Sequence, residues 1–338
     1  MSTEYFSMNV TKPRVAVTMG DPAGIGSEVI VKALPQVAAI ADVVVIGDAT
    51  VLQRALTVCD SDLIVRTVDG PGADTRDGEL AVVDLDLVDS VEFSTLREEY
   101  GAASLAYVER AIELAQSGTV DAIATAPINK QATRMAGSEY AGHTGMLADY
   151  TDTDDYAMLL VEDDLRVSHV STHVPLRAAI ENVTADSVLT TIEVTAAALQ
   201  DLGVNEPTIA VAGLNPHASD GGLLGDEDDK EIRPAVERAV DAGIDAVGPE
   251  SPDTAFQPAA QGVYDAVVAM YHDQGHIPIK MLGFASGETI SGVNVTIGLP
   301  IVRTSVDHGT AFDIAGEGVA SAASMIDTIE TAARLADE

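Results

Sequence analysis

Histidine is the residue type whose placement in this sequence points most directly to chemistry. The chain has seven histidines, and the first of them is His143. Three follow apolar, strand-like runs: His173 follows LRVSHVST, His217 follows TIAVAGLNP and His272 follows YDAVVAMY. Ligand sites of open α/β sheets form at the carboxyl ends of strands, so three imidazoles delivered there predict an open divalent-metal site. The alternative is that each is a loop or core histidine satisfied by the backbone, which is our interpretation of His169.

Three glycine-rich stretches could approach a ligand closely. GDPAGIG (20–26) follows a strand pattern and opens a helix, but its spacing is not the GxGxxG of a dinucleotide loop. NPHASDGGLLG (215–225) is long enough to be a functional loop. VRTSVDHGTAFDIAGEG (302–318) is interpreted as a third loop, with Arg303 as a rare cation. Its Asp313 could accept hydrogen bonds from ribose hydroxyls, or could equally be a turn or helix cap.

The elements that must position these residues alternate between strand and helix patterns from end to end. This alternation predicts an α/β fold with a largely parallel sheet. Thr184 is a plausible N-cap, and the acidic stretches 152–155 and 226–231 are interpreted as solvated surface. The expected strands are 14–19, 43–46, 63–68, 80–85, 122–125, 157–161, 167–171, 208–212, 266–270 and 294–297, and the expected helices are 25–34, 102–116, 185–202, 231–241 and 322–335.

The charge balance excludes several classes of function. Asp and Glu number 54 against 18 Lys and Arg, a formal net charge of -36, and five of the cations are lysines. Such a surface repels phosphate backbones and anionic membranes, so we expect no nucleic-acid or membrane partner. A lone cysteine, Cys59, excludes an internal disulfide, and no apolar run reaches the length of a membrane span. We expect a soluble, cytoplasmic protein of halophilic type.

Several segments together carry a family resemblance. The chain resembles the 4-hydroxythreonine-4-phosphate dehydrogenase family, which includes NAD-dependent oxidative decarboxylases of vitamin B6 synthesis and relatives acting on sugar acids. The resemblance runs in the family's order from Thr18 to Gly318. The matching segments are TMGDPAGIGSE (18–28), TAPINK (125–130), GHT (142–144), STHVPLR (171–177), GLNPHASDGGLLG (213–225), MYHDQGHIPIK (270–280) and VNVTIGLPIVRTSVDHGTAFDIAGEG (293–318).

The resemblance implies a role for particular residues. His173, His217 and His272 match the family's ligands for one divalent metal ion, which could be Zn, Co, Mn, Ni or Mg. The implied substrate contacts are His143, Thr144, Lys280, Asn294 and Arg303. The implied NAD-binding loop includes His308, Gly309, Asp313 and Ile314, with Asp313 favouring NAD over NADP. We expect Lys280 or Asp273 to handle protons; for Asp273, a role in orienting the neighbouring His272 is at least as plausible.

The resemblance also implies a fold and a reaction. The expected fold is like that of isocitrate and isopropylmalate dehydrogenases, not Rossmann, with two α/β/α domains and a cleft between them. Residues 10–128 with 286–338 would form the first domain, on the cofactor side, and residues 129–285 the second, with the metal ligands and the interface of a homodimer. The expected reaction oxidises the C3 hydroxyl of a 4-phosphorylated four-carbon acid and then removes CO2.

Departures from the family pattern leave the substrate open. Gly145 and Asp220 each stand where the family usually has Glu, and His276 replaces an apolar residue. The substrate is 4-phosphooxy-L-threonine or a phosphorylated tetronate (4-phospho-D-threonate or 4-phospho-D-erythronate), which differ in an amine or a hydroxyl at C2. The tetronates would give dihydroxyacetone phosphate. A catalytically inactive metal- or phosphate-binding regulator is a remote alternative.

The acidic surface yields a first testable prediction. At low ionic strength the self-repulsion of 36 net negative charges is no longer screened. Dialysis from molar KCl into dilute buffer is therefore expected to unfold the protein, as followed by far-ultraviolet circular dichroism. Full retention of the native spectrum in dilute buffer would reject a halophilic surface.

Overall fold

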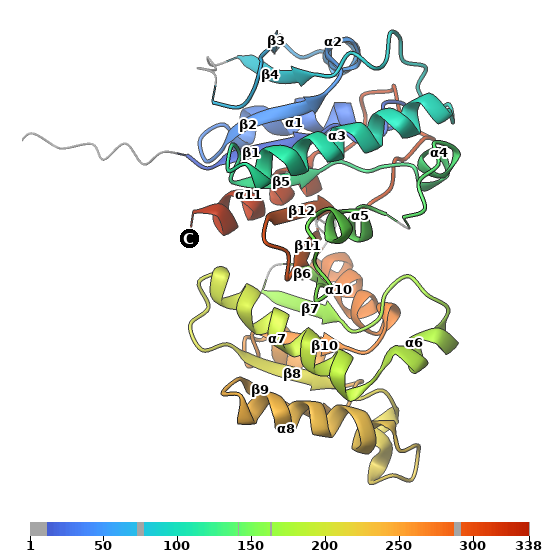
Figure 1. Cartoon of the computed structure of the whole chain (residues 1–338), viewed down its shortest axis with the longest axis vertical. Coiled ribbons are helices and arrows are strands. Elements are labelled where there is room, and N and C mark those ends of the chain that lie inside the picture. The colour runs from blue at the N-terminus through green and yellow to red at the C-terminus, as the bar shows by residue number, and fades with distance from the viewer. Residues whose placement is uncertain (1–11, 73–77, 141, 163, 287–291, 338) are drawn as a thin grey trace, which may run out of the picture.

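The strands form one continuous sheet, flanked by helices (Figure 1). The computed structural model describes residues 12–72, 78–140, 142–162, 164–286 and 292–337. The strands are β1 (Arg14–Thr18), β2 (Asp42–Gly47), β3 (Ile64–Thr67), β4 (Glu79–Asp84), β5 (Ala122–Thr125), β6 (Ala157–Glu162), β7 (Leu165–His169), β8 (Thr208–Ala212), β9 (Asp245–Glu250), β10 (Ala266–Ala269), β11 (Val293–Ile297) and β12 (Val302–Val306).

The helices vary widely in length. They are α1 (Gly26–Val37), α2 (Ala49–Val58), α3 (Glu98–Gln116), α4 (Lys130–Met135), α5 (His143–Tyr150), α6 (Leu176–Asn182), α7 (Ala185–Asp201), α8 (Arg233–Asp241), α9 (Phe256–Ala260), α10 (His272–Ser286) and α11 (Ala323–Ala336). A short 3₁₀ helix (Pro216–Asp220) and a π-helical turn (Asp228–Ile232) complete them. Thr184 caps α7 as predicted, because its hydroxyl accepts from Ser187 N.

The strand order explains both the parallel character of the sheet and its division. The order is β3-β4-β2-β1-β5-β12-β11-β6-β7-β10-β8-β9. The first six strands in this order run parallel, and so do the last four, while β11 and β6 supply the antiparallel pairs between the two groups. The α/β class and the largely parallel sheet are thus confirmed. The order also differs from that of a Rossmann sheet, as expected.

The expected strands and helices are all present, and two further strands are corrections. The range 302–318 was expected to be a loop, but β12 occupies Val302–Val306 in the middle of the sheet. Its polar residues Arg303, Thr304 and Ser305 are buried and hide the strand pattern. The other unexpected strand is β9, whose Gly248-Pro249 step breaks its pattern.

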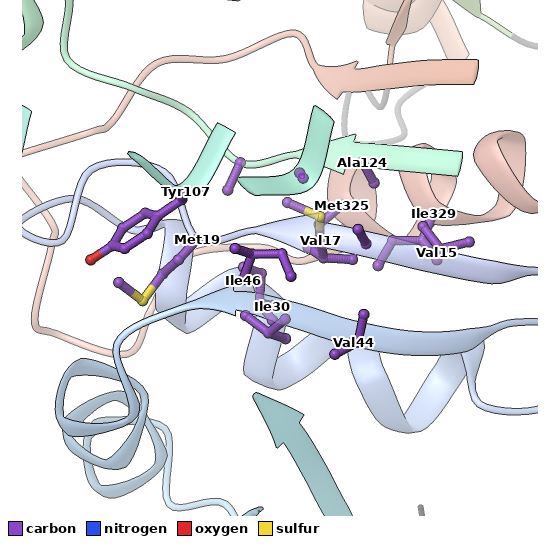
Figure 2. Packing of buried hydrophobic residues seen from close by; sticks show 14 of the residues in the cluster. Val15, Val17, Met19, Ile30, Val44, Ile46, Tyr107, Ala124, Met325 and Ile329 are labelled. Atoms are coloured by element: carbon purple, nitrogen blue, oxygen red, sulfur yellow. The ribbon is translucent and has the colours of Figure 1, made fainter. Parts of the chain in front are cut away.

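The chain passes from one half of the sheet to the other and returns. In Figure 1 the segment up to α5 forms the upper half, the segment from β7 to β10 the lower half, and β12 and α11 return to the upper half. Val15 and Val17 of β1 face Met325 and Ile329 of α11, and Ile30 of α1 packs beside β2 (Figure 2). Each such buried side chain contributes about 1.5–3 kcal/mol. The proposed domain boundaries stay a prediction.

Two side chains of α1 hold the end of the third glycine-rich stretch and the residues just after it. The carboxylate of Glu28 is buried and accepts from Gly316 N at 2.6 Å and from Gly318 N at 2.8 Å. One turn later, Lys32 Nζ donates to the carbonyls of Gly318 and Ala320. Helix α1 therefore fixes the end of the predicted cofactor loop through these four hydrogen bonds.

The clamp formed by the Glu28 carboxylate on Gly316 N and Gly318 N gives a prediction about stability. Glu28→Gln places an amide NH2 where a backbone N–H now donates, so one charge-assisted bond is lost and one donor is left buried. The free energy of unfolding should fall by about 2–3 kcal/mol, measured by urea unfolding at constant KCl. Glu193→Gln, at an exposed position of α7, removes the same charge and is the control. Equal urea midpoints for the two variants would contradict the clamp.

Candidate functional site

The structure places two of the three predicted metal-binding histidines together. Strands β7, β10 and β8 are adjacent and parallel, so their carboxyl ends lie along one edge of the sheet, as predicted. His173 follows β7 and His272 begins α10 after β10, and their ring centroids are 5.3 Å apart. His217, after β8, does not join them. Among the described residues, no three His, Cys, Asp or Glu side chains are grouped closely enough to hold a metal ion.

The His272 ring is oriented from two sides. Its Nδ1 lies 2.8 Å from Asp273 Oδ1, so in the neutral tautomer that fits this contact Nδ1 donates to the carboxylate and Nε2 carries the lone pair. The His276 ring stacks on it at 3.7 Å with an interplanar angle of 9°, and His276 Nδ1 donates to the His272 carbonyl. Asp273 therefore orients a predicted ligand, which is the alternative role considered for it.

His169 is a buried core histidine, as predicted, and lies behind these rings. Its ring centroid is 4.8 Å from that of His276. Burial, together with the neighbouring imidazoles, lowers the pKa of His169 to about 3. Burial also lowers the pKa of His173, helped by the charge of Lys130. Neutral imidazoles are the form that binds metal.

The loop that carries His217 has an unusual backbone. Residues 217–222 all have positive φ, between 45° and 87°. For residues with a Cβ this conformation costs roughly 1–2 kcal/mol each. Asp228 supports the loop: it is buried and accepts from Leu214 N at 2.6 Å, from Asn215 N at 3.2 Å and from the Ser219 hydroxyl. The expectation that 226–231 is solvated surface is therefore wrong at Asp228.

Gln274 links two strand ends beside the histidines and was missed by sequence reasoning. Its Oε1 accepts from Met270 N at 2.6 Å, at the end of β10. Its Nε2 donates to the Gly213 carbonyl at 2.8 Å, at the end of β8. Gln274 thereby fixes the starts of the His217 and His272 segments relative to each other.

Arg303 is a buried cation without an acidic partner in the described chain. It is 2% exposed, and its NH1 and NH2 donate to the hydroxyls of Thr296 (2.9 Å) and Thr125 (2.7 Å). The Thr125 hydroxyl in turn donates to the Thr304 carbonyl. Burial lowers the pKa of Arg303 to about 9, so it stays protonated at neutral pH. Because both acceptors are neutral, the positive charge is left for an anion.

Other predicted substrate contacts surround Arg303. His143 and Thr144 begin α5, and Asn294 lies on β11, two residues before Thr296, the cross-strand partner of Arg303. His143 Nε2, Asn294 Oδ1 and Arg303 Nε are all enclosed and without a hydrogen-bond partner among the described residues. Burial and the charges of Arg303 and Lys130 lower the pKa of His143 well below its usual value. These orphaned atoms fit a polar, anionic ligand.

Lys280 lies on α10, the helix that His272 begins, and forms an ion pair with the segment after β12. Its Nζ is 3.0 Å from Asp307 Oδ2, and both side chains are partly exposed. Asp307 comes directly after β12, so this ion pair joins the strand of Arg303 to the helix of His272. Sequence reasoning did not single out Asp307, although it lies inside the quoted segment SVDHGT.

The remaining predicted site residues lie on the loop after β12. His308, Gly309 and Asp313 are exposed, Ile314 is partly buried, and the Asp313 carboxylate has no partner within the described ranges. The loop packs against the first glycine-rich stretch, where Ile25 N donates to the Thr310 carbonyl. A Cβ on Gly24 would come within 2.9 Å of Thr310, so glycine permits this close contact.

Asp21, in the first glycine-rich stretch, is a buried carboxyl group. It is 1% exposed, its Oδ1 accepts from Ala23 N at 2.8 Å, and its Oδ2 has no partner in the described part of the chain. Burial raises the pKa of Asp21 from 3.8 to about 6. The folded state therefore favours the protonated acid.

The fold and these residues define an α/β protein with two neighbouring histidine rings at the strand ends and a buried Arg303 cation. Comparison with known proteins gives the family. Residues 39–332 match the family model "Pyridoxal phosphate biosynthetic protein PdxA". The chain is 46% identical to a 4-hydroxythreonine-4-phosphate dehydrogenase of Trichlorobacter lovleyi, covering 97% of this chain and 99% of that protein. It is 47% identical to a D-threonate 4-phosphate dehydrogenase of Salmonella typhimurium, covering 95% and 98%.

A solved structure agrees with these matches. The crystal structure of a 4-hydroxythreonine-4-phosphate dehydrogenase from Klebsiella pneumoniae superposes with a TM-score of 0.88 at 44% identity, covering 98% of this chain and all of that one. The chain therefore belongs to the PdxA family, which confirms the resemblance. It is an oxidoreductase of the dehydrogenase type. In the described part of the chain, no helix is both long and apolar enough to cross a membrane.

The buried carboxyl of Asp21 yields a pH prediction. Because its pKa is higher in the folded than in the unfolded state, its contribution to stability is complete below about pH 4 and is lost as the pH rises through about 6. Asp21→Asn should therefore raise the free energy of unfolding above pH 6, by up to about 3 kcal/mol. Urea unfolding from pH 4 to 8 measures this, with the exposed Asp201→Asn as the control for charge. A constant difference between the two variants across this range would contradict it.

Proposed function

We propose that this protein oxidises the C3 hydroxyl of a 4-phosphorylated four-carbon acid with NAD and decarboxylates the product, as 4-hydroxythreonine-4-phosphate dehydrogenases do. The observation that carries the proposal is the buried guanidinium of Arg303, held by two neutral hydroxyls and surrounded by unpartnered polar atoms. In a chain of net charge -36, a buried cation that has no carboxylate partner among the described residues is suited to an anionic substrate.

In this proposal the phosphate binds beside Arg303. The planar guanidinium offers Nε to phosphate oxygens. His143 and Thr144, at the start of α5, contact the phosphate from the other side, and the Asn294 amide contacts a neighbouring hydroxyl or phosphate oxygen. A neutral His143 can donate one hydrogen bond without adding charge, in keeping with its lowered pKa.

The imidazoles of His173 and His272 fit one divalent metal ion. His272 presents a free Nε2 lone pair because Asp273 accepts from Nδ1, and His173 is neutral. When bound, such an ion polarises the substrate oxygens and stabilises the negative charge that develops during oxidation and decarboxylation. The ligand set suits Zn, Co, Mn or Ni, and Mg less well.

We place the complete metal site at the interface of a homodimer, with His217 as the third ligand. Exposed apolar side chains accompany every predicted ligand: Leu176 and Ile180 follow His173, Leu223 and Leu224 follow His217, and Ile277 and Met281 follow His272. Apolar groups of this kind mark surfaces that a partner covers. The absence of a three-ligand group within the described residues of one chain supports the same arrangement.

NAD is assigned to the loop after β12. The backbone at Gly309 is open, with no atom within 4 Å of where a Cβ would lie, so a cofactor can approach closely. His308 and Ile314 flank this approach. Asp313 is exposed and unpaired in the described ranges, so its carboxylate can accept from the ribose hydroxyls and would repel a 2′-phosphate.

Lys280 is our candidate for proton transfer or for holding the substrate carboxylate. The ion pair holds its ammonium 3.0 Å from Asp307 Oδ2, just after the end of β12. Asp273 is the other candidate for the base, but its hydrogen bond to His272 favours an orienting role. In either case the substrate C3 lies between the imidazoles and the phosphate pocket.

The substituent at C2 of the substrate, an amine or a hydroxyl, decides the biological role. A comparison of the two phosphorylated acids tests the proposal. We expect NADH formation at 340 nm, in molar KCl with an added divalent metal ion, to be faster with 4-phosphooxy-L-threonine than with 4-phospho-D-threonate. Because the phosphate pocket is buried, the unphosphorylated acids should react at least about 100-fold more slowly, which corresponds to about 3 kcal/mol.

The other outcomes are equally informative. Faster turnover of the phosphorylated tetronate would assign the chain to sugar-acid breakdown, the alternative that relatives named D-threonate 4-phosphate dehydrogenase favour. No turnover of either acid, with the metal bound, would contradict the proposed activity and favour a regulator.

A further inference from the structure

One lysine is free in a chain that otherwise engages its few lysines. Among the described residues, the ammonium of Lys130 has neither a hydrogen-bond acceptor nor an ion-pair partner. The other four lysines each have one: Lys12 donates to the Ala38 carbonyl, Lys32 to the Gly318 and Ala320 carbonyls, Lys230 pairs with Asp226, and Lys280 pairs with Asp307. Within the described chain, Lys130 is therefore the lysine with neither a carbonyl nor a carboxylate partner, in a sequence that holds 54 acidic residues.

The backbone of Lys130 is fixed in place. It is the first residue of α4, and the Asn129 side chain caps this helix by accepting from Gln131 N at 2.9 Å and from Ala132 N at 3.2 Å. The next turn is packed tightly on α3, because a Cβ on Gly101 would come within 2.1 Å of the Ala132 carbonyl. The base of the side chain is therefore rigid.

The side chain reaches toward the phosphate pocket. Its Cε lies 3.7 Å from the point where a Cβ on Gly142 would stand, so the aliphatic stem rests on the residue before His143. The charge of Lys130 acts on His143 and on His173, lowering the pKa of both. The ammonium therefore lies within electrostatic reach of the Arg303 pocket and of the histidine pair.

We propose that Lys130 is a further substrate-binding residue, whose ammonium contacts the substrate phosphate on the side that faces the histidines. This inference rests on the proposed function, because it needs a phosphorylated substrate. Arg303 binds the phosphate from the floor of the pocket, and Lys130 binds it from the exposed side. The Lys130 ammonium, unpaired among the described residues, can therefore attract the phosphate, which the surrounding acidic surface repels.

The test compares Lys130→Met with Lys12→Met. Methionine keeps an apolar stem over Gly142 and removes the charge, while Lys12→Met makes the same change at the far end of β1. We expect Lys130→Met to raise KM for the phosphorylated acid by about 10- to 100-fold, the usual loss for a charged hydrogen bond. It should also raise the inhibition constant of inorganic phosphate, and Lys130→Arg should restore most of both. Lys12→Met should leave both near the wild-type values.

Outcomes that overturn the inference are distinct from those that overturn the proposed function. If Lys130→Met matches Lys12→Met in KM and in phosphate inhibition, Lys130 does not contact the phosphate. If the wild type is inactive on both acids, the proposed function fails, and stabilisation by inorganic phosphate, read as a shift in Tm, still tests Lys130. In that assay the loss of the phosphate-dependent shift in Lys130→Met supports the contact, and an unchanged shift refutes it.

Discussion

The site depends on one electrostatic constraint, a buried guanidinium that no carboxylate neutralises within the described chain. Burying a cation is costly unless hydrogen bonds and an opposite charge compensate it. Here Thr125 and Thr296 accept hydrogen bonds from Arg303 but carry no charge. The positive charge of the guanidinium is therefore not neutralised by these two partners. The neighbouring strands supply these hydroxyls. Strands β5 and β11 pair with β12 on its two sides, and they carry Thr125 and Thr296. In the proposed function, the substrate phosphate supplies the missing negative charge.

The positions of the histidines depend on the topology of the sheet. Parallel strands bring their carboxyl ends to one edge, so His173 and His272 meet although about 100 residues separate them in sequence. The orientation of the rings then depends on local contacts, namely the Asp273 hydrogen bond and the stacked His276 ring. The loop of His217 is held in a left-handed conformation by Asp228, at an energetic cost that the buried carboxylate offsets. Backbone strain of this kind, here in the loop of a predicted metal ligand, is typical of functional sites.

Sequence periodicity was sufficient for most of the fold and for the strand-end histidines, because apolar strands and their carboxyl ends leave a local signal. It failed where the signal is not local. Strand β12 was interpreted as loop because Arg303, Thr304 and Ser305 are polar yet buried. Asp228 was interpreted as solvated because its partners, Leu214, Asn215 and Ser219, lie in another loop. The roles of Asp307 and Gln274 likewise depend on contacts between distant segments. The metal site, predicted from the strand-end histidines and implied again by the family resemblance, remains a prediction. The cofactor loop and the dimer interface come from the resemblance alone and also remain predictions.

The position of β11 and β12 within the sheet has a mechanical consequence. These neighbouring strands carry Asn294 and Arg303. Strand β12 ends the first parallel group, and β11 links it to β6, so the pair lies where the two parallel halves join. Any twisting of one half against the other must therefore be transmitted through the hydrogen-bonded strands that carry Asn294 and Arg303. In the proposed function, a substrate phosphate bound at Arg303 would stiffen these strands, so the resistance of the whole sheet to twisting would depend on whether substrate is bound.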